Sequence, residues 1–534
     1  MRCLPECGIA DGDLGLLFWT FGRFPSTGSD GENRFGRVTS HSDTFDLELL
    51  PKKRGAVLKA EEPWEGLYIA TFSPPLWDAE DGIFRQVYEC RYEDDRGKSG
   101  HRYALATSKD GINWEKPDLG LVDFEGSRHN NLFPTPAGRR LVHVVLDPDD
   151  PEPGRRYKGL LTVPEGRVPV VSPDCLHWQK LDALLPSGDA GTMAFDREKR
   201  LFMALLKRSN PNTVGRSYDI SFSHDFETWT EPRFVFGMDK GRDQEMARDV
   251  IRRRLIDPSR AKPLFIDPDP ATGWQHSEAS QRTLTWQCEC YNFGIVPYEG
   301  LYLGLITVYY PTGQRLPERT NTDGFNQVQL AVSRDLETWK RLGDRAPFLE
   351  TSPLTAGLVG NYDRLQLAAH NGIVTHDGEV RMYYTGMKRR VPQHDRWLDG
   401  SPRDASTLSD SERADWLDDT HSAMCLAVLR RDGFVSLDAG EDGGRLLTEP
   451  VKLTGPEVFL NLDAPRGHAR IEMLDADGNP LAGLSGDEAA TVTGNDIRQP
   501  VCWQATDRLN SLVGQTVRLR FHLLQCSLYA FWME

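Results

Sequence analysis

A seven-residue pattern, Ser-x-Asp-x-x-x-Trp, recurs along the chain and constrains the fold more than any other feature. Its clear copies lie at Ser108–Trp114, Ser172–Trp178, Ser223–Trp229 and Ser333–Trp339. Each follows an alternating apolar run, such as Tyr103–Thr107, which has the period of a strand buried on one face. Each copy therefore predicts a strand that leads into a tight turn. We expect the Asp to accept hydrogen bonds from turn amides and the Trp to close the edge of the unit.

A fifth, weaker copy at residues 426–434 completes the series. Recurring units of short strands predict a radial or stacked architecture, and five units closed into a ring leave no long exposed edge. After Gly440, alternating runs at 458–462, 469–474 and 517–523 are separated by turn signals and predict an antiparallel sandwich. The sequence thus predicts an all-β chain: a five-bladed β-propeller with a C-terminal β-sandwich.

The expected domain boundaries follow from this pattern. Residues 1–54 form an N-terminal segment that packs on the propeller, 55–440 the propeller and 441–534 the sandwich. Two polar stretches interrupt the repeats, Met238–Gln281 and Arg389–Ala423. The first is expected to be a loop insertion with a short helix. The second either rims a binding site or is a disordered surface insertion.

Composition narrows the class of ligand. The chain has 534 residues, 39% of them hydrophobic, and a net charge of -16. This charge disfavours nucleic acid and anionic membranes as partners and suits a neutral ligand. The N-terminus lacks the features of an export signal, and no apolar run is long enough to span a membrane, so we expect a cytoplasmic protein. Oligomeric state is not predicted.

Cysteine spacing and the absence of other motifs exclude several chemistries. The nine cysteines are scattered without paired spacing, which predicts reduced, mostly buried thiols. Neither a phosphate-binding loop nor a dinucleotide-binding glycine motif occurs, nor does a zinc-protease or serine-hydrolase motif. We therefore expect no cofactor. Acid-rich loops such as Asp147–Asp150 lack calcium-loop spacing, so no metal site is predicted.

The repeats and the C-terminal strands together resemble the clan of five-bladed glycosidases that includes the invertase-like family 32 and the arabinanase-like family 43. The stretches 106–117, 296–304 and 430–440 are similar to a bacterial family-32-like group. This resemblance implies a carbohydrate-active propeller with its site in the central funnel. The family-32 signatures Trp-Met-Asn-Asp-Pro-Asn-Gly and Arg-Asp-Pro are absent, so its fructose-specific residues do not carry across. Only Glu289-Cys290 resembles that family's Glu-Cys acid motif.

Glycoside hydrolysis commonly uses two carboxyl groups, one as proton donor and one as nucleophile or base. The innermost strand of each blade lines the axis of a propeller, so acids at the start of these strands converge. This reasoning selects Asp189, Glu289 and Glu65 as candidate catalytic residues. Glu289 is the candidate acid because aromatic neighbours raise a carboxyl pKa by desolvation. Asp189 is the candidate nucleophile or base, and Glu65 orients a hydroxyl or is a third acid.

Candidate substrate-binding residues lie near the same strand starts. We assign the opening of blade two to Asn130–Phe133, with His143 on a second strand. The aromatic candidates are expected to stack on a sugar ring. The full set of binding candidates is Trp64, Asn131, His143, Trp286, Tyr291 and Asp363.

The sequence supports more than one function for such a funnel. The first is a glycosidase that acts on a short oligosaccharide or glycoside. A glycoside phosphorylase would need a basic phosphate pocket, for which Lys207-Arg208 and Lys388–Arg390 are candidates. A non-catalytic carbohydrate-binding propeller and a protein-interaction scaffold remain open as well.

Overall fold

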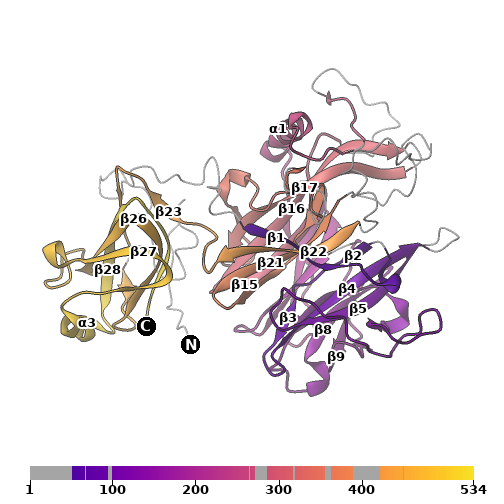
Figure 1. Ribbon diagram of the computed structural model, residues 1–534, viewed down its shortest axis with the longest axis horizontal. Coiled ribbons are helices and arrows are strands. Elements are labelled where there is room, and N and C mark those ends of the chain that lie inside the picture. The colour runs from indigo at the N-terminus through magenta and orange to yellow at the C-terminus, as the bar shows by residue number, and fades with distance from the viewer. Residues whose placement is uncertain are drawn as a thin grey trace.

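A computed structural model describes residues 51–534, except 67, 94–98, 190, 264, 271–284, 317–318, 355–361, 389–420 and 449. In this part of the chain the strands form five propeller sheets and one C-terminal sheet. Figure 1 shows the propeller and the C-terminal sheet as separate bodies joined near β23. The five-bladed β-propeller predicted from the repeats is confirmed.

Each blade is an antiparallel sheet of four strands, with a fifth short strand in blades one and five. Blade one contains β2 (Tyr68–Ala70), β3 (Leu76–Asp78), β4 (Ile83–Glu93), β5 (Ser99–Ser108) and β6 (Leu132–Phe133). Blade two contains β7 (Leu141–Leu146), β8 (Tyr157–Val163), β9 (Gly166–Ser172) and β10 (Gln179–Lys180). Blade three contains β11 (Gly191–Asp196), β12 (Leu201–Ser209), β13 (Val214–Ser223) and β14 (Arg233–Met238).

The last two blades follow the same plan. Blade four contains β15 (Glu289–Tyr298), β16 (Leu301–Leu316), β17 (Arg319–Ser333) and β18 (Lys340–Arg341). Blade five contains β19 (Gln366–Ala368), β20 (Ile373–His376), β21 (Glu379–Met387), β22 (Ser422–Arg430) and β1 (Lys52–Lys59).

Contacts between blades close the ring. Along the chain, β3 contacts β7, β7 contacts β11, β11 contacts β15 and β17 contacts β19, and β22 returns to β2. Polar side chains support these junctions. The amide of Val144 donates to Ser73 Oγ at 2.6 Å between blades one and two, and Thr192 Oγ1 donates to the Phe293 carbonyl at 2.6 Å between blades three and four.

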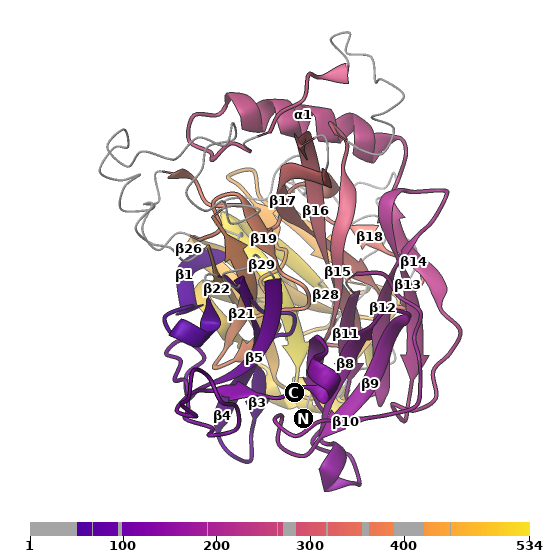
Figure 2. The same cartoon turned by 90° about the vertical axis from the view of Figure 1, so that its right-hand side faces the viewer.

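The first described strand completes the last blade. β1 pairs antiparallel with β22 and is the outer strand in the order β19-β21-β22-β1 (Figure 2). Its Lys53 Nζ donates to the Asp363 carboxylate at 2.5 Å and to Ser352 Oγ at 3.0 Å. This pairing covers the edge that β22 would otherwise expose.

The Ser-x-Asp-x-x-x-Trp copies form the predicted turns. In each, the Asp Oδ1 accepts from the backbone amides two and three residues later, as Asp225 does from Glu227 at 2.8 Å and Thr228 at 2.7 Å. The same bonds occur at Asp110, Asp174 and Asp335. At the fifth copy the carboxylate of Asp432 instead accepts from the Tyr298 hydroxyl at 2.6 Å, because it lies beside the end of β15.

The opening of blade two differs from the prediction. Leu132 and Phe133 pair with Ala104 and Tyr103 of β5, so they are the outer strand of blade one. Blade two begins with β7, which carries His143. The alternating pattern did not distinguish the two because both short runs are apolar and buried.

The insertion after β14 contains a helix, α1 (Arg242–Ile256), that packs beside β16. It buries Ala247 and Ile251 against blade four. A short helix was expected in this stretch, and α1 is longer, at 15 residues. The second stretch, Arg389–Ala423, lies outside the described residues until residue 421.

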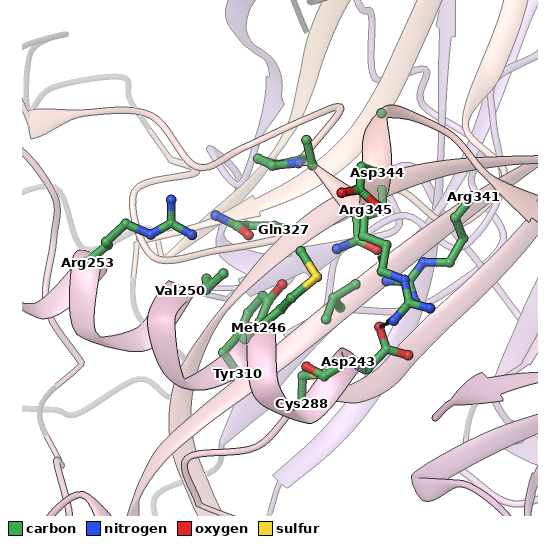
Figure 3. A pocket seen from close by; sticks show the side chains of 15 residues that line it. Asp243, Met246, Val250, Arg253, Cys288, Tyr310, Gln327, Arg341, Asp344 and Arg345 are labelled. Atoms are coloured by element: carbon green, nitrogen blue, oxygen red, sulfur yellow. Dashed lines mark hydrogen bonds and ion pairs between the residues drawn. The ribbon is translucent and has the colours of Figure 1, made fainter. Parts of the chain in front are cut away.

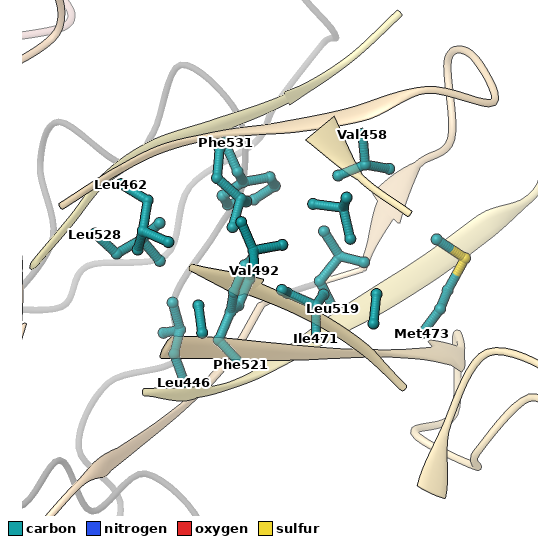
Figure 4. Packing of buried hydrophobic residues seen from close by; sticks show 14 of the residues in the cluster. Leu446, Val458, Leu462, Ile471, Met473, Val492, Leu519, Phe521, Leu528 and Phe531 are labelled. Carbon is teal, nitrogen blue, oxygen red and sulfur yellow. The ribbon is translucent and has the colours of Figure 1, made fainter. Parts of the chain in front are cut away.

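The C-terminal sheet folds around its own apolar core (Figure 4). Its strands are β23 (Leu437–Ala439), β24 (Gly444–Leu447), β25 (Val451–Lys452), β26 (Val458–Asp475), β27 (Ala490–Val501), β28 (Thr516–Leu524) and β29 (Cys526–Met533), with the helix α3 (Thr506–Leu512). The runs at 458–462 and 469–474 belong to one long strand, β26, whose register with β27 shifts between Ala464 and Ala469. Every described cysteine is a free thiol, and all but Cys502 are buried.

Candidate active site

The side chain of Tyr291 on β15 is the centre of a charged cluster. The Lys207 ammonium lies 5.1 Å from its ring centroid, and the Arg216 guanidinium carbon also lies 5.1 Å away. Lys207 is on β12 and Arg216 on β13, so blade three supplies both cations. Both cations therefore lie over the Tyr291 ring, which the sequence analysis gave as a candidate for sugar binding.

Two of the predicted catalytic carboxylates belong to this cluster. Asp189 precedes β11, and its Oδ1 lies 3.2 Å from Lys207 Nζ. Glu289 begins β15 and forms an ion pair with Arg216, whose backbone amide also donates to Glu289 Oε2 at 3.3 Å. The structure thus brings Asp189, Glu289 and Tyr291 into one neighbourhood, although they are distant in sequence.

A cavity of about 530 Å³ opens beside Asp189. The link between blades two and three forms one wall, and the β12–β13 hairpin forms the other. Its lining residues are Glu165, Pro186, Ser187, Gly188, Asp189, Lys207, Arg208, Ser209 and Arg216. The volume is within the range of small-molecule sites.

Blade one contributes a second group of charges that sequence reasoning missed. Glu89 on β4 is fully buried, and its carboxylate accepts from Arg91 Nε at 2.6 Å, Arg140 Nε at 2.8 Å and the Tyr103 hydroxyl at 2.8 Å. Burial opposes its ionisation, but the bond from His101 and the two guanidiniums outweigh this and hold the pKa of Glu89 well below its usual range. Glu89 is therefore an ionised carboxylate.

Tyr68 on β2 lies beside the blade-one group. The Arg91 guanidinium carbon lies 4.5 Å from the Tyr68 ring centroid. Burial raises the pKa of Tyr68, and the charges of Arg91 and Glu89 act on it in opposite directions. Tyr291 of blade four also interacts electrostatically with Tyr68, so the two phenols lie near each other.

Buried polar side chains, His143 of blade two and His370 and Asn371 of blade five, form a group that we call the polar floor. His143 Nδ1 bonds the Phe72 carbonyl at 2.8 Å, and its ring lies 6.0 Å from that of His370, which follows β19. Asn371 Nδ2 donates to the Met193 carbonyl at 2.6 Å and so joins blade five to blade three. Three atoms of this floor, His143 Nε2, His370 Nδ1 and Asn371 Oδ1, are buried without a hydrogen-bond partner.

Both floor histidines are neutral at pH 7. Burial lowers the pKa of His370 to about 4, and the nearby Lys207 charge adds to this. Burial also lowers the pKa of His143 well below its usual range, with a further contribution from His370. The floor can therefore offer neutral imidazoles to a bound hydroxyl.

The remaining blade-one candidates form a separate buried network. Glu65, in the short helix η2 (Pro63–Glu65), is fully buried. It accepts from the Tyr88 hydroxyl at 2.5 Å and from Lys116 Nζ at 2.7 Å. Asn131 Nδ2 donates to the same hydroxyl at 2.7 Å, and Asn131 Oδ1 accepts from Trp64 Nε1 at 2.7 Å. These bonds join η2 to blade one and do not involve the Tyr291 cluster.

Two further binding candidates also lie elsewhere. Trp286 is buried in the core between blades three and four, and its Nε1 donates to the Asp267 carbonyl at 2.8 Å. Asp363 is buried and accepts from Lys53 and from the Tyr384 hydroxyl at 2.9 Å. Of the nine predicted site residues, Asp189, Glu289 and Tyr291 share the charged cluster, and His143 belongs to the polar floor.

The missed residues share a weak sequence signal. Arg91 and Arg216 are charged residues within strands that also contain apolar side chains. A charge in such a strand indicates a polar surface on one face of the blade. The sequence does not show which face points to the axis.

A second, smaller cavity of about 300 Å³ lies under α1 (Figure 3). Its apolar side is formed by Met246, Val250, Val308 and Tyr310. At its polar side Asp243 accepts from Arg345 at 2.9 Å and also pairs with Arg341. This cavity lies beside Cys288, directly before Glu289.

Comparison with known proteins gives distant structural likenesses only. No family model matches the chain, and no curated protein does. Among solved structures, a Bombyx mori GH32 β-fructofuranosidase aligns at 10% identity and a TM-score of 0.36, covering 90% of this chain and 94% of its own. An α-L-arabinofuranosidase from Podospora anserina aligns at 8% identity and a TM-score of 0.38, covering 72% and 99%.

An N-acetylgalactosamine deacetylase from F. plautii also aligns, at 13% identity and a TM-score of 0.36, covering 76% of this chain and 96% of its own. Activity is therefore inferred from the residues of the site.

None of the helices in the described part of the chain has the length and apolar character of a membrane span.

Proposed function

We propose that this protein is a glycoside hydrolase that cleaves a short oligosaccharide or glycoside at the axial end of its propeller. One observation supports this above others: Asp189 and Glu289, from different blades, share one charged cluster around Tyr291. Glycoside hydrolysis commonly uses two carboxyl groups that flank the scissile bond, and these two lie beside an aromatic ring and a cavity. Neutral polar groups on the floor suit sugar hydroxyls.

The ion pairs bear on the role of each carboxylate. A guanidinium favours the ionised form of a carboxylate, so the Glu289–Arg216 pair suits a nucleophile or a base for water. We therefore propose that role for Glu289 in place of the acid role expected from its sequence neighbours. Asp189, whose side chain is 68% exposed, is then the candidate to carry the proton once substrate displaces Lys207.

The test is hydrolysis of a panel of nitrophenyl glycosides by the parent protein and by Asp189→Asn and Glu289→Gln. Loss of one acid or base should lower kcat by at least about a hundredfold while circular dichroism and the melting temperature stay near those of the parent. Asp149→Asn is the matched control, because Asp149 forms a surface pair with Arg197 away from the axis. If both site variants keep the parent rate, the proposal is wrong. Saturable sugar binding without product would indicate a carbohydrate-binding propeller instead.

A further inference from the structure

Two cations at the 530 Å³ cavity, Lys207 and Arg167, lack a buried carboxylate partner, whereas Arg216 pairs with Glu289 and Arg208 lies 3.8 Å from Asp219. Lys207 is 5% exposed, and burial lowers its pKa. Its ion-pair partner, Asp189, is largely in solvent. An exposed carboxylate compensates a buried ammonium only weakly because water screens the interaction.

Arg167 on β9 adds a second buried charge. It is 1% exposed, and its guanidinium donates to the carbonyls of Gly166 at 2.9 Å and Gly188 at 2.8 Å. Its Nε is buried without a hydrogen-bond partner. Asp189 is the carboxylate whose charge acts on Arg167, and its side chain is largely exposed. Burial lowers the pKa of Arg167 to about 10, which leaves it charged at pH 7. Gly188 lies in the cavity wall, so this charge lies directly behind it.

A buried cation without a counterion costs several kcal/mol, and a bound anion removes much of that cost. The cavity also offers Arg208, Arg216 and the hydroxyls of Ser187 and Ser209. Guanidiniums and hydroxyls are the usual donors to carboxylate and phosphate oxygens. The chain as a whole carries a net charge of -16, so an anion would be attracted here by the local cations against the field of the rest of the molecule.

We propose that this cavity is an oxyanion subsite, which binds either a negatively charged group of the carbohydrate or free inorganic phosphate beside Asp189. The inference rests on the proposed function for its position next to the reacting bond, but anion binding itself does not depend on hydrolysis. It revises the expectation of a purely neutral ligand.

The two sources of the oxyanion lead to different chemistry. A carboxylated sugar would be cleaved by water, with its carboxylate held by Lys207. Free phosphate would replace water: one phosphate oxygen forms the bond to the anomeric carbon, the glycosidic C–O bond breaks, and the leaving oxygen takes the proton that Asp189 carries. The products are then a sugar phosphate and an alcohol.

Anion binding is tested by calorimetry with inorganic phosphate and glucuronate, with glucose as the neutral counterpart and sodium chloride at equal ionic strength. Lys207→Met should weaken phosphate or glucuronate binding at least tenfold more than it weakens glucose binding. Lys199→Met is the matched control, since Lys199 is on the same blade and bonds the Tyr302 hydroxyl at the opposite end of β12. Arg208→Ala, an exposed change in the cavity wall, provides a second variant if Lys207→Met does not fold.

Parallel assays of cleavage identify the source. Faster cleavage on adding phosphate, with release of a sugar phosphate, identifies free phosphate. Preference for nitrophenyl glucuronides over glucosides, independent of phosphate, identifies an acidic sugar. The inference is overturned if neither anion binds more tightly than chloride, or if Lys207→Met and Lys199→Met behave alike. If anions bind but no glycoside is cleaved, the oxyanion subsite is supported and the proposed hydrolase activity is wrong. If a glycoside is cleaved but no anion binds, the hydrolase activity is supported and the subsite is wrong.

Discussion

The side-chain amide of Gln244 holds the backbone of Cys288 in both directions. Its Oε1 accepts from the Cys288 amide at 2.9 Å, and its Nε2 donates to the Cys288 carbonyl at 3.1 Å. Cys288 directly precedes Glu289, so α1 fixes the start of the strand that carries a candidate catalytic carboxylate. Gln244 is therefore a positioning residue for the site.

Replacing Gln244 with Ala should loosen the start of β15. Three backbone groups lose a partner, the amide and carbonyl of Cys288 and the carbonyl of Asp239, which should cost about 1–3 kcal/mol of local stability and speed hydrogen exchange at the Cys288 amide at least tenfold. If Glu289 acts in catalysis, kcat should fall with little change in KM. Arg248→Ala, an exposed change on the same helix, should alter neither quantity. Unchanged exchange at Cys288 would contradict this role.

The buried histidines of the floor predict a loss of stability in mild acid. The folded pKa of His370 is about 4, below the value near 6.5 in an unfolded chain. The unfolded state therefore binds the proton first, and stability that is complete above pH 6.5 declines as the pH falls toward 4. The loss from this group is on the order of 3 kcal/mol.

Urea unfolding at pH 7 and pH 4.5 measures this loss. His370→Asn should reduce the difference in the free energy of unfolding between pH 7 and pH 4.5. Asn tolerates the positive φ of 41° at this position. His129→Asn, which changes a histidine side chain that is 88% exposed, should leave the difference in unfolding free energy between the two pH values as in the parent. An equal loss of unfolding free energy between pH 7 and pH 4.5 in all three proteins would show that His370 is not the titrating group.

The turn aspartates predict a second acid transition at lower pH. At Asp225 partial burial opposes ionisation, but the amides of Thr228 and Glu227 outweigh it and lower the pKa to about 2. Its contribution is therefore complete above pH 4 and lost between pH 4 and 2. Asp225→Ala should lower the free energy of unfolding by about 1–2 kcal/mol at pH 7, similar to loss of a helix cap. It should also make the melting temperature depend less on pH below pH 4. Thermal unfolding from pH 2 to 7 tests both, and an unchanged melting temperature at pH 7 would argue against a structural role for the turn.

The Lys53–Asp363 pair predicts how strongly β1 is held. Lys53→Met leaves the buried Asp363 with the Tyr384 hydroxyl but without its cation, which should cost about 3 kcal/mol. Lys52→Met, an exposed change in the same strand, should cost little. The double variant Lys53→Met/Asp363→Asn should recover part of the loss, as measured by urea unfolding. A Lys53→Met protein as stable as the parent would mean that the pair contributes nothing to the joining of β1 and β22.

The fold could be predicted because its signal is local. The Asp of each turn bonds amides two and three residues away, so the motif and its structure lie in the same short segment. The blade-two opening was assigned wrongly because which of two apolar runs is innermost depends on pairing with β5, which is not a local property.

The site could be predicted only in part for a similar reason. Acids at the starts of inner strands led to Asp189 and Glu289. Arg91 and Arg216 were missed because alternation along a strand shows that it has two faces but not which of them faces the site. Arg140 lies in the link before β7, where no alternation applies. Glu65 was selected by the same reasoning, yet its bonds to Tyr88 and Lys116 require the short helix η2, which three residues do not reveal.

The position of β1 bears on how this chain is made. The ribosome synthesises β1 before every blade, but its partner β22 emerges only after most of the propeller, at ~5–20 residues per second. For much of this time, on the order of tens of seconds, β1 has no partner strand, because β22 has not yet been synthesised. A chain that ends before β22 lacks the strand with which β1 pairs, so such a truncated product would leave β1 unpaired.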